Sequence, residues 1–227
     1  MVSSIRLSKI DETLRPCHAR IREEDECFFL CEYTAKKGFA FSETNSLISN
    51  LKKKPGESNK PGYQYKARWI GQAARMFAAT FNPAWLEIAT LVPIPGSKTH
   101  DNPDHDDRME RICHEIGQNL DIRTLVKKST STRASHEAGA RKRVTLEELL
   151  DVLYVDEELA EPEPVNIGVF DDVLTNGTHF RAIHTILLQR FPDALVSGFF
   201  IVRTVYPSPF EDFDQDLQEL RQREHWL

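Results

Sequence analysis

The sequence is poor in cysteine, carries no excess of positive charge and lacks any long hydrophobic run. Four cysteines among 227 residues do not provide the disulfide framework of a small secreted domain. The formal net charge of -6 argues against general affinity for nucleic acid or anionic membranes, because both attractions need a basic face. The longest apolar run, around residues 195–202, is too short to cross a bilayer. We therefore expect a soluble protein without a membrane partner.

The N-terminal residues, MVSSIRLSKIDETLRPC, lack the apolar centre of a signal peptide. Charges are scattered through this stretch, so we expect an intracellular, cytoplasmic protein. The hydrophobic content of 40% is ordinary for a globular protein, and 227 residues are enough for one well-cored domain with a small accessory lobe.

The order of the predicted elements indicates the fold class. Strands are expected at residues 27–35, 86–94, 120–126, 166–170 and 195–204. Helices are expected after Ser42, which can act as a cap, and at residues 64–81, 108–119 and 177–191, whereas residues 146–155 are ambiguous. Alternation of strand and helix is typical of a mainly parallel sheet flanked by helices, so we predict an α/β fold.

Residues 169–178, VFDDVLTNGT, place two neighbouring carboxylates directly after an apolar strand. In open α/β sheets, ligands bind beyond the carboxyl ends of the strands, which is where Asp171 and Asp172 are expected. Two adjacent like charges repel each other, and leaving both ionised is unfavourable unless a cation or several hydroxyl donors face them. A ribose diol, with or without magnesium, is a suitable partner.

The next residues suit a phosphate group. Thr175, Asn176, Gly177 and Thr178 lie where the chain turns into a predicted helix, so backbone amides, hydroxyls and the positive helix end converge there. Together with the aspartates they predict a grip on a ribose 5-phosphate. Two alternatives stay open: a plain strand, turn and helix whose Thr and Asn only cap the helix, and a receiver-type phosphoacceptor domain, for which little chain follows Asp172.

This motif resembles the signature of the type I phosphoribosyltransferases, which bind phosphoribosyl pyrophosphate (PRPP) with magnesium. The Val-Pro-Ile-Pro turn, the lysine-rich stretch before the 64–81 helix and the late basic segment are loosely similar to the competence-associated branch of that family. That branch has an N-terminal cysteine metal site and a basic segment after the proline turn; here HDNPDHDD follows the turn. A further departure is Gly168, where the family usually has a larger apolar residue.

The resemblance implies a role for each part of the site. Asp171 and Asp172 would contact the ribose and, through the ligand, the magnesium ion, and they are the catalytic candidates. Thr175, Asn176, Gly177 and Thr178 would bind the 5-phosphate. Pyrophosphate would be bound by Gly96, Ser97 and Lys98 in the turn after an earlier strand. A flexible lid would close over it with Lys127, Lys128, Arg133 and Arg141.

The resemblance also implies an activity and a division of the chain. We expect transfer of ribose 5-phosphate from PRPP to an unknown, nitrogen-containing small-molecule acceptor, with release of pyrophosphate; a homodimer is compatible with the family. The alternative is a catalytically silent regulator that senses PRPP or binds a partner with the same fold. Residues 1–62 would contribute a hood, residues 63–206 the core and residues 207–227 a helical tail. Aromatic candidates for the acceptor site are Phe39, Phe41, Phe210 and Trp226.

Two metal sites are weaker alternatives. The HDNPDHDD loop offers the ligand types that a divalent cation accepts, so a metal-dependent hydrolase is a third possible activity. Its candidate ligands are His100, Asp101, Asp104, His105, Asp106 and Asp107. Cys27 and Cys31, with Cys17 and His18, could bind zinc, but CFFLC reads as an apolar strand with buried thiols.

Overall fold

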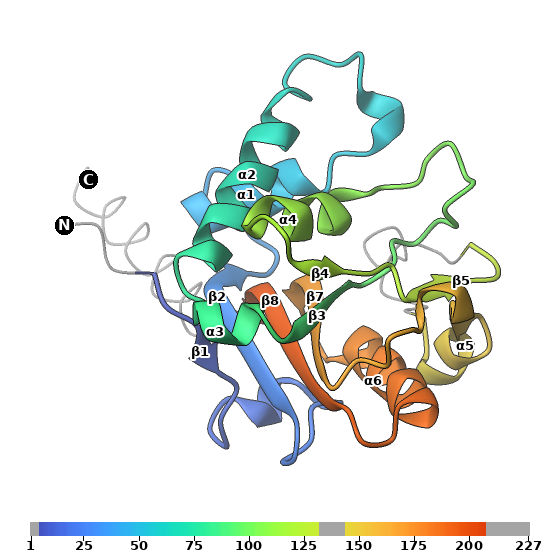
Figure 1. Ribbon diagram of the computed structural model, residues 1–227. Helices are drawn as coiled ribbons and strands as arrows, with labels where there is room; N and C mark the ends of the chain where they lie inside the picture. The colour runs from blue at the N-terminus through green and yellow to red at the C-terminus, as the bar shows by residue number, and fades with distance from the viewer. Residues whose placement is uncertain (1–4, 132–143, 208–227) are drawn as a thin grey trace, which may run out of the picture.

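The computed structural model describes residues 5–131 and 144–207 (Figure 1). Six strands form one sheet in the order β1-β2-β8-β7-β3-β4. Their bounds are β1 Ser8–Lys9, β2 Glu26–Thr34, β3 Ala89–Pro93, β4 Asp121–Ile122, β7 Asn166–Leu174 and β8 Leu195–Val205. All neighbours are parallel except the short edge strand β1, which runs antiparallel to β2. The predicted α/β class with a mainly parallel sheet is therefore confirmed.

Helices cover both faces of the sheet because its central strands are apolar on both sides. One face packs against α1 (Glu43–Leu51), α2 (Tyr65–Ala78) and α4 (Arg108–Ile116). The other face packs against α5 (Leu146–Leu150) and α6 (Thr178–Arg190). Every residue of β3 is buried, as expected for a strand covered on both sides. The helix ends and strand ends at one edge of this sheet create the site described below.

The N-terminal segment contributes to the sheet. β2 pairs in parallel with β8 along its length, from Glu26 opposite Ser197 to Thr34 opposite Val205. Residues 26–34 therefore belong to the main sheet, and their alternating apolar side chains enter both layers of the core. Residues 208–227, which include most of the predicted helical tail, lie outside the described residues.

Several boundaries differ from the sequence prediction. The chain from 120 to 126 is not one strand: β4 joins the main sheet, and β5 (Val126–Lys128) pairs antiparallel with β6 (Leu153–Val155). The ambiguous residues 146–155 divide into α5 and β6. α3 (Pro83–Leu86) occupies the start of the predicted 86–94 strand, because Asn82 caps a helical turn that begins at a proline. Short 3-10 helices occur at Arg15–Cys17, Pro55–Glu57 and Glu157–Leu159.

Among the described residues, no helix combines the length and the apolar character that crossing a membrane would require.

Candidate functional site

The two aspartates lie inside β7, beyond the point where its neighbour β3 ends. β3 follows β7 only as far as Pro93 opposite Phe170, and the Ile94 amide then donates to the Phe170 carbonyl at 2.9 Å. On its other side β7 continues along β8 to Leu174. The predicted strand end at Phe170 was therefore four residues short, because pairing with β8 extends the strand. Asp171 and Asp172 nevertheless stand at the carboxyl edge of β3, where ligands of parallel sheets bind.

Asp172 is held by a positively charged residue that begins α4. Arg108 donates to the Asp172 Oδ2 atom from Nε at 3.0 Å and from Nη2 at 2.7 Å. The Lys52 Nζ atom, just after α1, lies 3.7 Å from Asp172 Oδ1. Burial alone would raise the pKa of Asp172, but Lys52 and Arg108 outweigh burial and hold this pKa well below its usual range. Asp172 is therefore ionised and paired.

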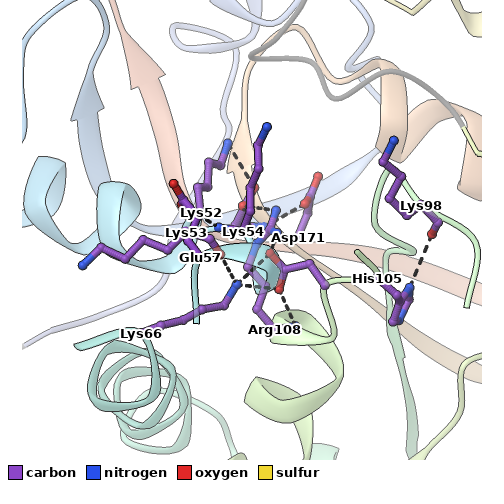
Figure 2. Close-up of polar contacts among 11 residues, drawn as sticks. Lys52, Lys53, Lys54, Glu57, Lys66, Lys98, His105, Arg108 and Asp171 are labelled. Carbon is purple, nitrogen blue, oxygen red and sulfur yellow. Dashed lines mark hydrogen bonds and ion pairs between the residues drawn. The ribbon is translucent and has the colours of Figure 1, made fainter. Parts of the chain in front are cut away.

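The charge network continues into the acidic loop (Figure 2). The Arg108 Nη1 atom donates to Asp106 Oδ2 at 2.6 Å, and the buried Lys66 ammonium donates to both oxygens of Asp106 at 2.8 Å. Lys66 also donates to the carbonyl of Lys53 at 2.6 Å. Burial lowers the pKa of Lys66, although Asp106 opposes this change. Alternating charges thus connect α2, the loop, α4 and β7.

Asp171 has a different environment from its neighbour. Its Oδ1 atom accepts a hydrogen bond from the backbone amide of Asp172 at 2.8 Å, and its residue exposure is 9%. Burial first, and then the negative charge of Asp172, raise the pKa of Asp171 to about 7. A carboxyl group that gains or loses its proton near neutral pH, at a ligand-binding edge, is a functional candidate.

Two basic side chains lie near the aspartates of β7: Lys128 on β5 and His179 on α6. Burial lowers the pKa of Lys128 to about 8, and the charge of Asp171 offsets part of this change. Burial, followed by the charge of Lys128, lowers the pKa of His179 to about 4, so its imidazole is neutral at pH 7. Lys128 was predicted to belong to a flexible lid, and its exposure is only 9%. It stands at the end of β5, within electrostatic reach of Asp171.

The turn at residues 175–178 is fixed from one side by the N-terminal segment. His18 Nδ1 contacts the Thr175 carbonyl oxygen, and the Arg20 amide donates to the Asn176 carbonyl at 2.8 Å. In a trans peptide the amide N–H points opposite to the carbonyl. The N–H groups of Asn176 and Gly177 therefore point away from the segment that covers the turn, as an anion cradle requires.

Gly177 permits this geometry. Its φ of +86° is left-handed, and a Cβ atom at this position would lie 2.8 Å from Ile21 Cδ1. The Thr178 amide is already satisfied by the Asn176 side chain, with a distance of 3.2 Å from Thr178 N to Asn176 Oδ1. Asn176 thus caps the turn, and the helix behind it begins at Thr178. The predicted capping role and the predicted phosphate role are compatible here.

The turn with Gly96, Ser97 and Lys98 follows β3 at the same edge of the sheet. The Lys98 carbonyl accepts from His105 Nδ1 at 3.4 Å, and the Thr99 amide donates to Ser131 Oγ at 3.1 Å. In the view of Figure 2, Lys98 lies across Asp171 from Lys52. The structure therefore places the predicted pyrophosphate turn and the predicted ribose carboxylates on one edge.

The predicted lid is only partly within the described residues. Lys127 on β5 forms an ion pair with Asp156, which directly follows the paired strand β6, and this contact raises the pKa of Lys127. Arg133 and Arg141 lie outside the described residues. The aromatic candidates for the acceptor site are similarly divided: Phe39 and Phe41 are exposed after β2, and Phe210 and Trp226 are outside the described residues.

The described residues contain no group of three or more His, Cys, Asp or Glu side chains placed to hold a metal ion. In the acidic loop, the His100 and His105 rings stack at 5.0 Å, and His105 Nε2 lies 3.5 Å from a Glu110 carboxylate oxygen. Asp106 pairs with cations in the network above. The cysteines have free thiols, and burial raises the pKa of Cys27 and Cys31.

Sequence reasoning missed the basic partners of the aspartates. Lys52 was seen only as part of a lysine-rich stretch, and Lys66 and Arg108 were counted as helix residues. The available signal was charge balance, because a buried pair of carboxylates requires nearby cations. Sequence separation hid it: Arg108 lies 64 positions from Asp172, and Lys66 lies 40 positions from Asp106.

Comparison of this chain with protein-family models and with curated proteins gave no match. The class defined by its fold is the α/β proteins with a mainly parallel sheet. Its function is therefore inferred from the residues at the carboxyl edge of that sheet.

Proposed function

We propose that this protein binds PRPP with magnesium and transfers the ribose 5-phosphate to a nitrogen-containing acceptor, releasing pyrophosphate. The observation that carries the proposal is the pairing of two buried carboxylates with a glycine turn at a helix start. Asp171 and Asp172 stand at the carboxyl edge of the sheet, and the turn at 175–178 follows them directly. A ribose 5-phosphate has hydroxyl donors at one end and an anion at the other, which matches this order.

The turn supports binding of the 5-phosphate. Its Asn176 and Gly177 amides point away from the segment that covers it, and α6 adds the positive end of a helix of 13 residues. The hydroxyl groups of Thr175 and Thr178 provide further donors beside these amides. Two amides and two hydroxyl groups around a short turn are suited to a phosphate dianion.

Magnesium fits the donor set if the ligand supplies most of the oxygens. Mg²⁺ is commonly bound through one or two carboxylates together with substrate phosphates, and it does not need a complete protein cage. Asp171 is the carboxylate suited to this contact, since Asp172 is paired with Arg108. When bound, magnesium would neutralise negative charge on the pyrophosphate. The turn at Gly96, Ser97 and Lys98 lies on the same edge and would bind the remaining pyrophosphate oxygens.

The reaction requires positioning and charge neutralisation but no protein nucleophile. The bond between the anomeric carbon and the pyrophosphate oxygen breaks, and its electron pair leaves with pyrophosphate. The acceptor nitrogen forms the new bond to that carbon and releases its proton to solvent. Positive charge that develops on the ribose ring is stabilised by the ionised form of Asp171. Lys98 and Lys128 would stabilise the departing anion.

Pyrophosphate release from PRPP tests this proposal. The protein is incubated with PRPP, MgCl2 and a panel of bases and amines, and Asp171→Asn is assayed in parallel. We expect release with at least one acceptor and its loss in Asp171→Asn. His105→Ala is the control, because a hydrolase built on the acidic loop would depend on that residue. PRPP binding without release across the panel would identify a regulator, and neither binding nor release would contradict the proposal.

A further inference from the structure

We infer that the two aspartates have different roles: Asp171 contacts the ribose, whereas Asp172 is a positioning residue that Arg108 holds away from the ligand. The inference rests on the proposed function and deepens it. The family resemblance alone implies one shared role for both carboxylates. The contacts of Asp172 in this chain separate the two.

Both carboxylate oxygens of Asp172 already face cations. Oδ2 accepts two hydrogen bonds from Arg108, and Oδ1 faces the Lys52 ammonium at 3.7 Å. The Asp172 side chain is only 6% exposed. A ribose hydroxyl at Oδ2 would have to displace the charge-assisted hydrogen bonds from Arg108, and one at Oδ1 would have to enter beside the Lys52 ammonium at a carboxylate that is almost fully buried. Displacement at Oδ2 is unfavourable, because the half-buried Arg108 would lose one of its two carboxylate partners.

Arg108 cannot move with Asp172, because its remaining nitrogen is also engaged. Nη1 donates to Asp106, and Asp106 is in turn held by Lys66 through both oxygens. The Lys66 side chain is 3% exposed and the Arg108 side chain 19%. This alternating series of charges fixes the position of Asp172 relative to α2 and α4. Asp172 thereby anchors the part of β7 that carries Asp171.

Asp171 is suited to contact the ligand. Its carboxylate accepts a hydrogen bond from the backbone amide of the next residue, Asp172. Asp171 lies in β7, the strand that leads into the 175–178 turn. Charged groups face it from several elements: Asp172 on β7, Lys52 after α1, Arg108 on α4 and Lys128 on β5. Ribose hydroxyls would donate to its ionised form. The backbone amide of Asp172 holds the Asp171 carboxylate through its hydrogen bond, so Asp172 acts on the ligand through the position of Asp171.

The test compares PRPP binding, in the presence of MgCl2, for the wild type and three variants. Asp171→Asn should raise the dissociation constant by on the order of 100-fold, because a charged acceptor of ribose hydrogen bonds is lost. Asp172→Asn should destabilise the fold, because half-buried Arg108 loses a carboxylate partner. The double variant Arg108→Gln/Asp172→Asn removes both charges and should recover most of that stability. Its dissociation constant should rise by about tenfold or less.

Binding is compared on folded protein, at a temperature below the unfolding transition of every variant, so that a loss of stability alone does not change it. Asp172→Asn leaves Arg108 without one of its carboxylate partners beside Asp171, so its dissociation constant should rise more than that of the double variant. All variants are measured in the same buffer with MgCl2.

Each outcome has a different consequence. If the wild type binds PRPP and the double variant loses as much affinity as Asp171→Asn, Asp172 contacts the ligand and this inference is wrong. A double variant that binds PRPP no better than Asp172→Asn would also contradict it. If the wild type itself does not bind PRPP, the proposed function fails, and the assignment of ligand roles fails with it.

Discussion

At the scale of single residues, Gly177 determines whether the phosphate turn can form. Its left-handed φ of +86° is unfavourable for a residue with a side chain, and Ile21 occupies the space that a Cβ atom would need. Gly177→Ala should therefore lower the free energy of unfolding by about 1–2 kcal/mol. We also expect it to weaken stabilisation by PRPP, because the turn amides would be displaced. Thermal unfolding with and without PRPP measures both effects.

Gly38 provides the matched control for that substitution. It lies in an exposed loop, and a Cβ atom there would have no neighbour within 4 Å. Gly38→Ala should leave stability within about 0.5 kcal/mol of the wild type or raise it slightly, because the unfolded chain loses freedom. Equal losses in the two variants would mean that backbone strain at Gly177 is not the cause.

The raised pKa of Asp171 predicts that the stability of the fold depends on pH. Because burial raises its pKa to about 7 in the folded protein, the folded state binds more protons than the unfolded chain between about pH 4 and pH 7. The contribution of Asp171 to the free energy of unfolding therefore falls as pH rises through this range. Asp171→Asn removes that decline.

The measurement is the difference in free energy of unfolding between Asp171→Asn and the wild type. As pH rises from 4 to 7, the free energy of unfolding of Asp171→Asn should increase relative to that of the wild type by on the order of a few kcal/mol. Taking a difference removes the opposite trend from His179, whose neutral form is favoured by burial. A difference that stays constant with pH would show that Asp171 ionises normally.

At the scale of secondary-structure elements, Asn45 connects the end of β2 with the start of α1. Its buried amide group donates to the Thr34 carbonyl at 3.0 Å and to the Lys37 carbonyl at 3.2 Å. Ser42 caps the same helix, because its hydroxyl oxygen accepts a hydrogen bond from the backbone N–H of Asn45 at 3.0 Å. Because Lys52 follows α1 directly, this junction also places a cation beside Asp172.

Asn45→Ala should therefore lower the free energy of unfolding by about 2–3 kcal/mol, since it leaves several buried polar groups without partners. Asn82→Ala is the control: Asn82 also caps a helix, but it is exposed, and its side-chain oxygen accepts from the Ala84 backbone amide. That substitution should lower the free energy of unfolding by about 1 kcal/mol. Chemical denaturation measures the free energy of unfolding of both variants. A smaller loss for Asn45→Ala than for Asn82→Ala would contradict the role of Asn45 in connecting β2 with α1.

The elements that could be predicted were those with strong local signals. Alternation and length located β2 and β8 to within a residue at each end, and the Ser42 cap located α1. Tertiary contacts decided the remainder. Residues 120–126 were misread because β4 and β5 belong to different sheets, and β7 was extended by its pairing with β8. The aspartates and the turn were visible in the sequence because they are adjacent.

Their cationic partners could not be predicted, because they come from elements that only the folded chain brings together. Arg108 begins a helix after an acidic loop, so its local interpretation is a helix residue near favourable acids. Only the placement of α4 over the end of β7 directs it to Asp172. For the same reason, the sequence suggested equal roles for two carboxylates that the fold places in unequal surroundings.

At the scale of the whole molecule, the position of β2 predicts one cooperative unit. β2 pairs with β8 along nearly its whole length, and β8 pairs with β7 in the same way, so the N-terminal segment shares both layers of the core. A separate hood would unfold on its own. Two buried thiols report on this difference: Cys27 on β2 and Cys113 on α4.

Burial raises the pKa of both thiols and blocks access, so they should react with a thiol reagent only when the structure opens. Across a denaturant series, the opening free energies at Cys27 and Cys113 should follow one line with a common slope, because a single transition exposes both. Peptide mass spectrometry resolves each site, and exposed Cys17 reports reagent activity throughout. If Cys27 opened with a smaller slope than Cys113, the N-terminal segment would be an independent unit, and β2 would be a detachable strand despite its central pairing.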